Sequence, residues 1–201
     1  LDVVTRDNII KTHQIDTAKK IILFPARMTS WKGQLEFIDV IKKMDTQNVL
    51  VLFVGDTKNE SYTKLVRDKI KNNNLTNTFK ILGSVNQGEL RSLYQIADLS
   101  VSFPLRAEGF GRTVSESLYS NTPVLAFDYG GVKNQLENLS DLFKVKPHDY
   151  QGLPKKIEVL LNLNEDQKKD ALQDAQLVIE KNFSKTNMVN QYMKLYESIK
   201  S

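Results

Sequence analysis

Cysteine is absent from the 201 residues of this sequence. Its absence excludes disulfide bonds, thiolate chemistry and zinc sites built on cysteine. Histidine is scarce, and the two histidines, His13 and His148, lie far apart and outside any cluster with the spacing of metal ligands. Since no pair of Asp or Glu residues has the setting of a metal site either, we expect neither a metal ion nor a cofactor.

Long hydrophobic runs are absent too, because no apolar stretch approaches the roughly 18 residues that a membrane-spanning helix needs. A secretory signal peptide is also lacking, and the chain starts at Leu1 rather than at Met. We therefore expect a cytoplasmic fragment of a longer protein, with a peripheral position at the inner face of the membrane as one form of that location. The net charge of +4 suits a phosphate-bearing ligand, an anionic membrane or an ordinary solvated surface, without choosing among them.

Short apolar runs are present instead, and they predict buried β-strands. The predicted strands span residues 20–26, 48–54, 78–82, 98–103 and 123–127, with a weaker one at 142–145. Apolar residues at helical spacing, and a capping box that begins at Asn86, predict helices between and after these strands. The predicted helices span residues 33–44, 60–71, a segment from 86, 111–120, a short segment near 134, 153–161, 166–180 and 187–199.

The alternation of strands and helices predicts an α/β fold: a Rossmann-like parallel sheet of about six strands with helices on both faces and a C-terminal helical tail. We divide the chain into a linker remnant at 1–19, a domain at 20–182 and a last helix at 183–201. That helix carries an apolar stripe on an otherwise polar surface, which must be buried on the sheet or on a neighbouring domain. The stripe consists of Met188, Tyr192, Leu195, Tyr196 and Ile199.

The candidate ligand site lies in the loops that follow the strands, because open α/β sheets bind ligands at the carboxyl ends of their strands. The loop after the first strand holds two cations, Arg27 and Lys32, before Gly33 opens the next helix. The loop after the fourth strand, Glu108-Gly109-Phe110-Gly111-Arg112, is glycine-rich and leads into a helix. Free N–H groups at a helix start bind anions, and glycine lets an anion approach closely. Together the two loops predict a diphosphate site.

Several familiar phosphate motifs do not match these loops. A dinucleotide fingerprint would need a third glycine where Val114 stands, and it would follow the first strand. A Walker A loop ends in Gly-Lys-Ser/Thr, whereas Lys32 precedes Gly33. A phospho-receiver domain would have acidic residues at the end of the first strand, where Arg27 stands. The scattered basic residues also give no reason to expect a nucleic-acid partner.

Two glutamates stand on either side of the predicted helix start. Glu108 lies in the loop and Glu116 lies about one and a half turns inside the helix, so both can face one cleft. A carboxylate can accept hydrogen bonds from both hydroxyls of a vicinal diol, and a nucleotide sugar offers one such diol on each of its sugars. The alternative is that the two charges only stabilise the helix dipole, which is worth about 0.3–1 kcal/mol.

Four stretches in register resemble the C-terminal domain of the glycosyl transferases group 1 family of retaining GT-B enzymes. The first is 25–33, with Arg27, Lys32 and Gly33, and the second is Phe53-Val54-Gly55-Asp56. The third runs from Ile81-Leu82-Gly83-Ser84-Val85 to Asp98. The fourth joins Glu108-Gly109-Phe110-Gly111 and Glu116 to Pro123-Val124 and Gly130-Gly131.

The resemblance implies a role for each site residue. Arg27 and Lys32 would hold the diphosphate and stabilise it as it leaves, which makes a metal unnecessary. The backbone N–H groups of Gly109, Phe110 and Gly111 would orient sugar and phosphate, next to Gly33. Glu108 would contact the sugar, Glu116 the ribose hydroxyls, and the backbone near Val85 the base. Trp31, in a variable position of the family loop, would cover the nucleotide or simply pack, and Arg112 would add a phosphate contact or stay in solvent.

The function implied is the donor-binding half of a retaining glycosyltransferase. It would bind a UDP-, GDP- or ADP-sugar and transfer the sugar to a hydroxyl of a glycan or lipid-linked acceptor held by a missing N-terminal domain. The last helix would pack partly on that domain. Synthesis of surface glycan, lipopolysaccharide or capsule is the expected setting. The alternatives are a non-catalytic nucleotide-sugar-binding module and another GT-B enzyme such as a nucleotide-sugar epimerase.

Overall fold

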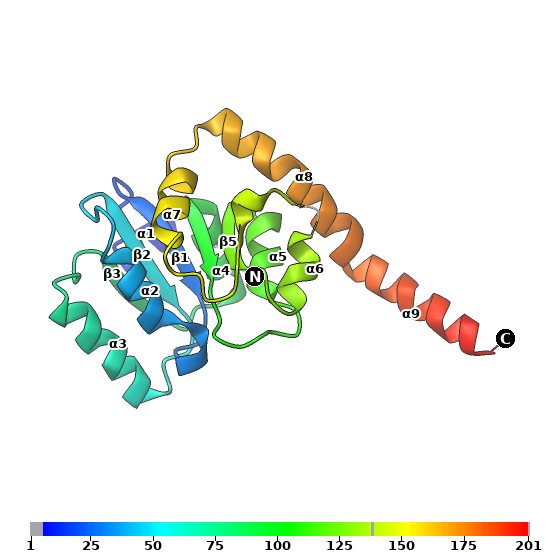
Figure 1. Ribbon diagram of the computed structural model, residues 1–201, viewed down its shortest axis with the longest axis horizontal. Helices are drawn as coiled ribbons and strands as arrows, with labels where there is room; N and C mark the ends of the chain where they lie inside the picture. The colour runs from blue at the N-terminus through cyan, green and yellow to red at the C-terminus, as the bar shows by residue number, and fades with distance from the viewer. Residues whose placement is uncertain (1–5, 138, 201) are drawn as a thin grey trace.

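The computed structural model describes residues 6–137 and 139–200. Within these residues six strands form one sheet, in the order β3-β2-β1-β4-β5-β6, and every pairing is parallel (Figure 1). The strands are β1 Lys20–Pro25, β2 Val49–Val54, β3 Phe79–Gly83, β4 Leu99–Ser102, β5 Val124–Phe127 and β6 Lys144–Val145. The predicted fold class is therefore confirmed. The order reverses between β1 and β4, as in doubly wound sheets that bind ligands at this switch point.

The helices also lie close to their predicted positions. Those between strands are α2 Gln34–Ile41, α3 Glu60–Asn72, α4 Gln87–Ile96, α5 Arg112–Tyr119 and α6 Gly131–Leu136. Those after β6 are α7 Leu153–Leu161, α8 Glu165–Phe183 and α9 Lys185–Lys200. The capping box is confirmed at the start of α4, where Asn86 and Glu89 each accept from the other's backbone N–H. The weak strand predicted at 142–145 shortens to two residues because residues 141–143 form a 3-10 turn.

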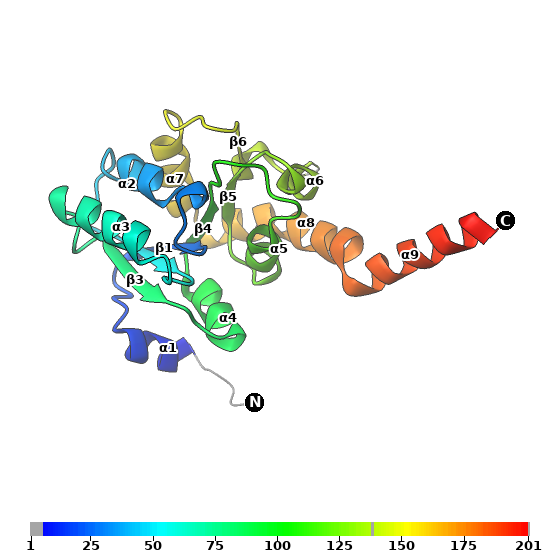
Figure 2. The same ribbon diagram turned by 90° about the horizontal axis from the view of Figure 1, so that it is seen from below.

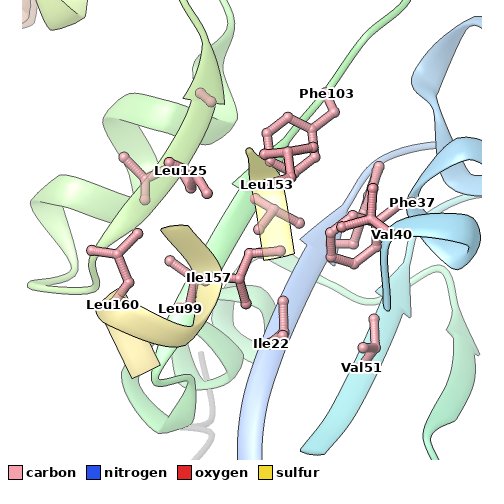
Figure 3. Packing of buried hydrophobic residues seen from close by; sticks show 14 of the residues in the cluster. Ile22, Phe37, Val40, Val51, Leu99, Phe103, Leu125, Leu153, Ile157 and Leu160 are labelled. Atoms are coloured by element: carbon pink, nitrogen blue, oxygen red, sulfur yellow. The ribbon is translucent and has the colours of Figure 1, made fainter. Parts of the chain in front are cut away.

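Successive residues of β1 and β2 are buried in two different hydrophobic clusters, one on each face of the sheet. Ile22 and Phe24 of β1 belong to the larger hydrophobic cluster, together with residues of α2, α3 and α7. Ile21 and Leu23 point the other way, into a second cluster with residues of α1 and α4. Figure 3 shows α2 and α7 on the first face, with Phe37, Val40, Leu153, Ile157 and Leu160 over the strands. Since both faces are covered, the strands are apolar throughout rather than alternating with polar residues.

One helix, α1 Arg6–His13, was not expected. It falls within residues 1–19, which the sequence analysis assigned to a linker. Ile9 is 1% exposed and packs in the cluster that includes Leu93 and Tyr94 of α4. The helix has eight residues and a weakly apolar face, so its sequence carries little helical signal. Packing on α4 supplies the burial that stabilises it.

The last helix, α9, extends away from the sheet as a continuation of α8 (Figures 1 and 2). All five residues of its predicted apolar stripe are more than half exposed, from 52% at Met188 to 72% at Ile199. The stripe is thus not buried on the sheet of this chain.

Among the described residues, no helix combines the length and apolarity needed to cross a bilayer.

Candidate functional site

A polar pocket of about 290 Å³ opens at the carboxyl edge of the sheet. Its lining comes from the segments that follow β1, β2 and β3 and from the first turns of α4 and α5. Three of the predicted site residues meet there: Arg27, Val85 and Glu116. Arg112 lines the same pocket, so a second arginine faces the site. Four further polar residues line the pocket without having been assigned a role there from the sequence: Asp56, Ser84, Gln87 and Thr113.

Arg27 is placed by the extension of β1 past its last ladder residue. Beyond Pro25, the N–H groups of Ala26 and Met28 each donate to β2 or the loop after it, at 2.8 Å from the carbonyls of Val54 and Asp56. Met28 is buried at 2% exposure, whereas the Arg27 side chain between them is exposed toward the pocket. The end of the strand therefore anchors the backbone and leaves the guanidinium available to an anionic ligand.

Glu116 is held by a buried tyrosine. The hydroxyl of Tyr94 lies 3.3 Å from Glu116 Oε2 and 3.3 Å from the carbonyl of Thr113. Burial, and then the charge of Glu116, raises the pKa of Tyr94 well above its ordinary value, so the phenol stays protonated and donates. The carboxylate keeps its other oxygen for a ligand. Tyr94 lies in the third stretch that resembles the family, but its contact with Glu116 depends on α4 lying beside α5.

Lys32 and Glu108 form an ion pair between the loops after β1 and β4, with side chains only 17% and 12% exposed. The ammonium of Lys32 also lies 4.2 Å from the centre of the Trp31 ring, which gives a cation–π contact. Of the two roles that the sequence leaves open for Trp31, packing or covering a ligand, the structure shows packing against Lys32. A phosphate that approached Lys32 would share the ammonium with Glu108.

The glycine-rich loop before α5 packs against the start of α6. A β-carbon at Gly131 would overlap the carbonyl oxygen of Gly109, so glycine is required where the two segments touch. The N–H of Gly131 donates to the carbonyl of Glu108 at 2.8 Å. At Gly109 itself an added β-carbon would meet nothing within 4 Å, so the space beside this residue is open. The loop is thus fixed on one side by Gly131, and the space beside Gly109 is open.

Three further residues of the predicted site, Gly111, Phe110 and Gly33, have structural roles. Gly111 caps α5 in the left-handed region with φ of 76°, a conformation that favours glycine. The ring of Phe110 packs edge-to-face on Phe183 at the end of α8, at 5.7 Å between centres. Gly33 caps α2 and lies against the backbone of Phe103, just past β4.

In the described part of the chain, no three or more His, Asp or Glu side chains lie together in a group that could hold a metal ion. The positive charge at the pocket comes from Arg27 and Arg112, with Lys32 nearby on the loop of Arg27. The chemistry that these side chains can carry out is the binding of an anion and, through Glu116 and Glu108, the acceptance of hydrogen bonds from hydroxyls.

The sheet order, the helices on both faces and the pocket at the switch point define a Rossmann-like domain of the kind found in GT-B glycosyltransferases. The chain belongs to the Glycosyl transferases group 1 family, whose model matches residues 5–176. A trehalose synthase from Thermococcus litoralis is 28% identical over 205 residues, which cover 97% of this chain and 49% of that protein.

Solved structures give the same result. A glycosyltransferase from Rickettsia africae superposes with a TM-score of 0.88 at 29% identity, over 96% of this chain and 51% of that one. The Anabaena protein HepE, solved in complex with UDP-glucose, superposes with a TM-score of 0.82 at 25% identity, over 96% of this chain and 53% of HepE. The chain thus spans about half the length of these three proteins.

Proposed function

We propose that this chain is the donor-binding domain of a retaining glycosyltransferase that transfers a sugar from a nucleotide sugar to a hydroxyl acceptor. The observation that carries the proposal is the pocket at the switch point, where Arg27 and Arg112 face the same space as Glu116. Cations for a diphosphate and a carboxylate for a diol are what a nucleotide sugar requires. The presence of UDP-glucose in HepE supports the same class of ligand.

The diphosphate binds between the two loops in this proposal. Arg27 contacts the phosphates from the end of β1, and the N–H groups of Gly109, Phe110 and Gly111 at the start of α5 add partial positive charge. Lys32 shares its ammonium between Glu108 and the phosphate that leaves. Because these cations neutralise the charge that develops on the diphosphate, the transfer needs no metal ion.

The two sugars of the donor contact different glutamates. Glu116, oriented by the Tyr94 hydroxyl, accepts from the ribose hydroxyls. Glu108 accepts from the transferred sugar, and the Lys32 ammonium at its side brings that sugar next to the leaving phosphate. The base lies against the backbone near Val85. The bond from the anomeric carbon to the diphosphate breaks, and the acceptor oxygen bonds to that carbon on the same face, which retains the anomeric configuration. The proton of the acceptor hydroxyl passes to the leaving diphosphate.

The acceptor belongs to the other half of the longer protein. This chain covers 49–53% of the relatives described above, and a protein of that length has room for a second domain that holds the acceptor. The exposed apolar stripe of α9 is the surface that this domain would cover. We expect a glycan or lipid-linked acceptor, synthesis of a surface glycan, lipopolysaccharide or capsule, and a cytoplasmic location, with a peripheral position at the inner face of the membrane as one form of it.

The test is a search for the nucleotide, carried out on the 201-residue chain. UDP, GDP, ADP and their sugars are screened by thermal shift with EDTA present, and the best ligand is titrated by calorimetry. We expect one nucleotide to bind, and Arg27→Ala to weaken it about tenfold or more, since a charge-assisted hydrogen bond is worth roughly 1.5–3 kcal/mol. Arg67→Ala, at an exposed position on α3, is the matched control. Absence of binding to every nucleotide, or binding that disappears with EDTA, would overturn the proposal.

A further inference from the structure

Gln34, the first residue of α2, is a fully buried polar residue on a face that otherwise consists of hydrophobic side chains. Both ends of its amide are bonded. Nε2 donates to the carbonyl of Arg27 at 2.9 Å, and Oε1 accepts from the hydroxyl of Tyr62 at 3.2 Å. Burying an amide costs free energy unless it is hydrogen-bonded, and an apolar side chain of similar size would avoid that cost. The core therefore does not explain why a glutamine stands here.

The need to bond the carbonyl of Arg27 explains the glutamine at position 34. The N–H groups of Ala26 and Met28 face β2, so the backbone of Arg27 between them faces the opposite side, toward β4. The register of β1 with β4 joins Ile22 and Leu23 to that strand, well before Arg27. At Arg27 the Gln34 amide thus supplies the donor that a neighbouring strand would otherwise provide. This bond fixes the plane of the peptide that follows Arg27.

Two further features hold Gln34 in place. Gly33, with φ of 86°, lies so close to the chain after β4 that an added β-carbon would overlap the carbonyl oxygen of Phe103. This close approach brings the start of α2 within reach of Arg27. Tyr62, on α3, is 5% exposed, and burial, followed by the charge of Glu36, raises the pKa of Tyr62 to about 12. Its hydroxyl therefore remains a donor to Gln34 at neutral pH.

We propose that Gln34 and Tyr62 are positioning residues for Arg27. The relay Tyr62–Gln34–Arg27 holds the loop after β1 so that the guanidinium is presented to the pocket before the ligand arrives. Preorganisation of this kind raises affinity because less freedom is lost on binding. The inference rests on the proposed function, in which Arg27 binds the diphosphate. Neither positioning residue needs to touch the ligand.

The experiment is a double-mutant cycle on the 201-residue chain, with UDP as the probe. Tyr62→Phe removes one hydroxyl and keeps the ring, and Gln34→Met removes the amide and keeps its length. Each is made alone and together with Arg27→Ala, and UDP affinity and melting temperature are measured for all. We expect Tyr62→Phe to weaken UDP about two- to tenfold and Gln34→Met about tenfold. Both effects should vanish in the Arg27→Ala background, whereas shifts in melting temperature should remain.

Tyr150→Phe is the matched control, because the Tyr150 hydroxyl is also buried but has no hydrogen-bond partner in the described structure. It should leave UDP affinity unchanged. If Tyr62→Phe and Gln34→Met weaken UDP equally with and without Arg27, their role is merely structural and the inference is wrong. It is also wrong if Arg27→Ala weakens UDP while Tyr62→Phe, the milder change, has no effect. If Arg27→Ala itself binds UDP as the wild type does, the role of Arg27 in the proposed function fails, and the inference fails with it.

Discussion

The substitution Glu108→Gln should change the affinity for a nucleoside diphosphate and the affinity for a nucleotide sugar differently. The carboxylate pairs with Lys32, and the two side chains are only 12% and 17% exposed. Glutamine keeps the shape of the side chain and removes its charge. Lys32 is then no longer shared between a carboxylate and a phosphate, whereas the transferred sugar loses an ionised acceptor for its hydroxyls. The nucleoside diphosphate and the nucleotide sugar should therefore respond in opposite directions.

The effect on UDP follows from the exposure of the ion pair, and the effect on the sugar follows from the loss of a hydrogen bond to a charged group. Exposed ion pairs contribute about 0.2–1 kcal/mol, and for a pair as covered as Lys32 and Glu108 we take the upper end, so UDP should bind up to about fivefold more tightly. A hydrogen bond to a charged group is worth about 1.5–3 kcal/mol, so the sugar contact is worth roughly 10- to 150-fold. The net result for the nucleotide sugar is binding weaker by roughly 2- to 30-fold.

The assay is calorimetry with UDP and with the UDP-sugar that gives the largest thermal shift. Glu116→Gln serves as the contrast and should weaken both ligands by a similar factor, because the ribose is common to them. Glu158→Gln, at an exposed position on α7, controls for the change in net charge. If Glu108→Gln weakens both ligands equally, or changes neither, Glu108 does not contact the transferred sugar.

Three other changes test the surrounding structure. Gly131→Ala places a β-carbon on the carbonyl of Gly109, so it should lower the free energy of unfolding by about 1–3 kcal/mol and weaken nucleotide-sugar binding. Unchanged values in urea unfolding and calorimetry would contradict the close contact. Ile9→Ala should cost about 2–5 kcal/mol in urea unfolding, because Ile9 is 1% exposed, whereas a loss under 0.5 kcal/mol would mean that α1 is not part of the core. Burial raises the pKa of Tyr62 and of Tyr150 to about 12 from an ordinary 10, so the unfolded chain loses these protons first. The free energy of unfolding should thus fall as pH rises from about 10 toward 12, less steeply in Tyr62→Phe, and an identical slope in both proteins would refute this assignment.

The sequence determined the strands, the helices from α2 onward and the edge of the sheet that holds the candidate site. Runs such as Ile21-Ile22-Leu23-Phe24 are apolar without alternation, which requires burial on both faces and hence a parallel sheet. The Asn86 capping box is local chemistry between residues three apart, and it was predicted correctly. The loops after the first and fourth strands were identified in the same way, since a parallel sheet brings the carboxyl ends of its strands to one edge. The resemblance to the glycosyl transferases group 1 family depends on these same local stretches.

Tertiary structure decided which side chains meet. Lys32 and Glu108 are 76 residues apart, and Tyr94 and Glu116 are 22 apart, so no local spacing predicts either contact. Helix α1 depends on the same kind of information, because its stability comes from α4 rather than from its own eight residues. The sheet order places β1 beside β4, and that one adjacency brings the loop of Arg27 to the loop of Glu108. Such contacts depend on how helices and strands pack, which is a property of the whole chain and not of any segment.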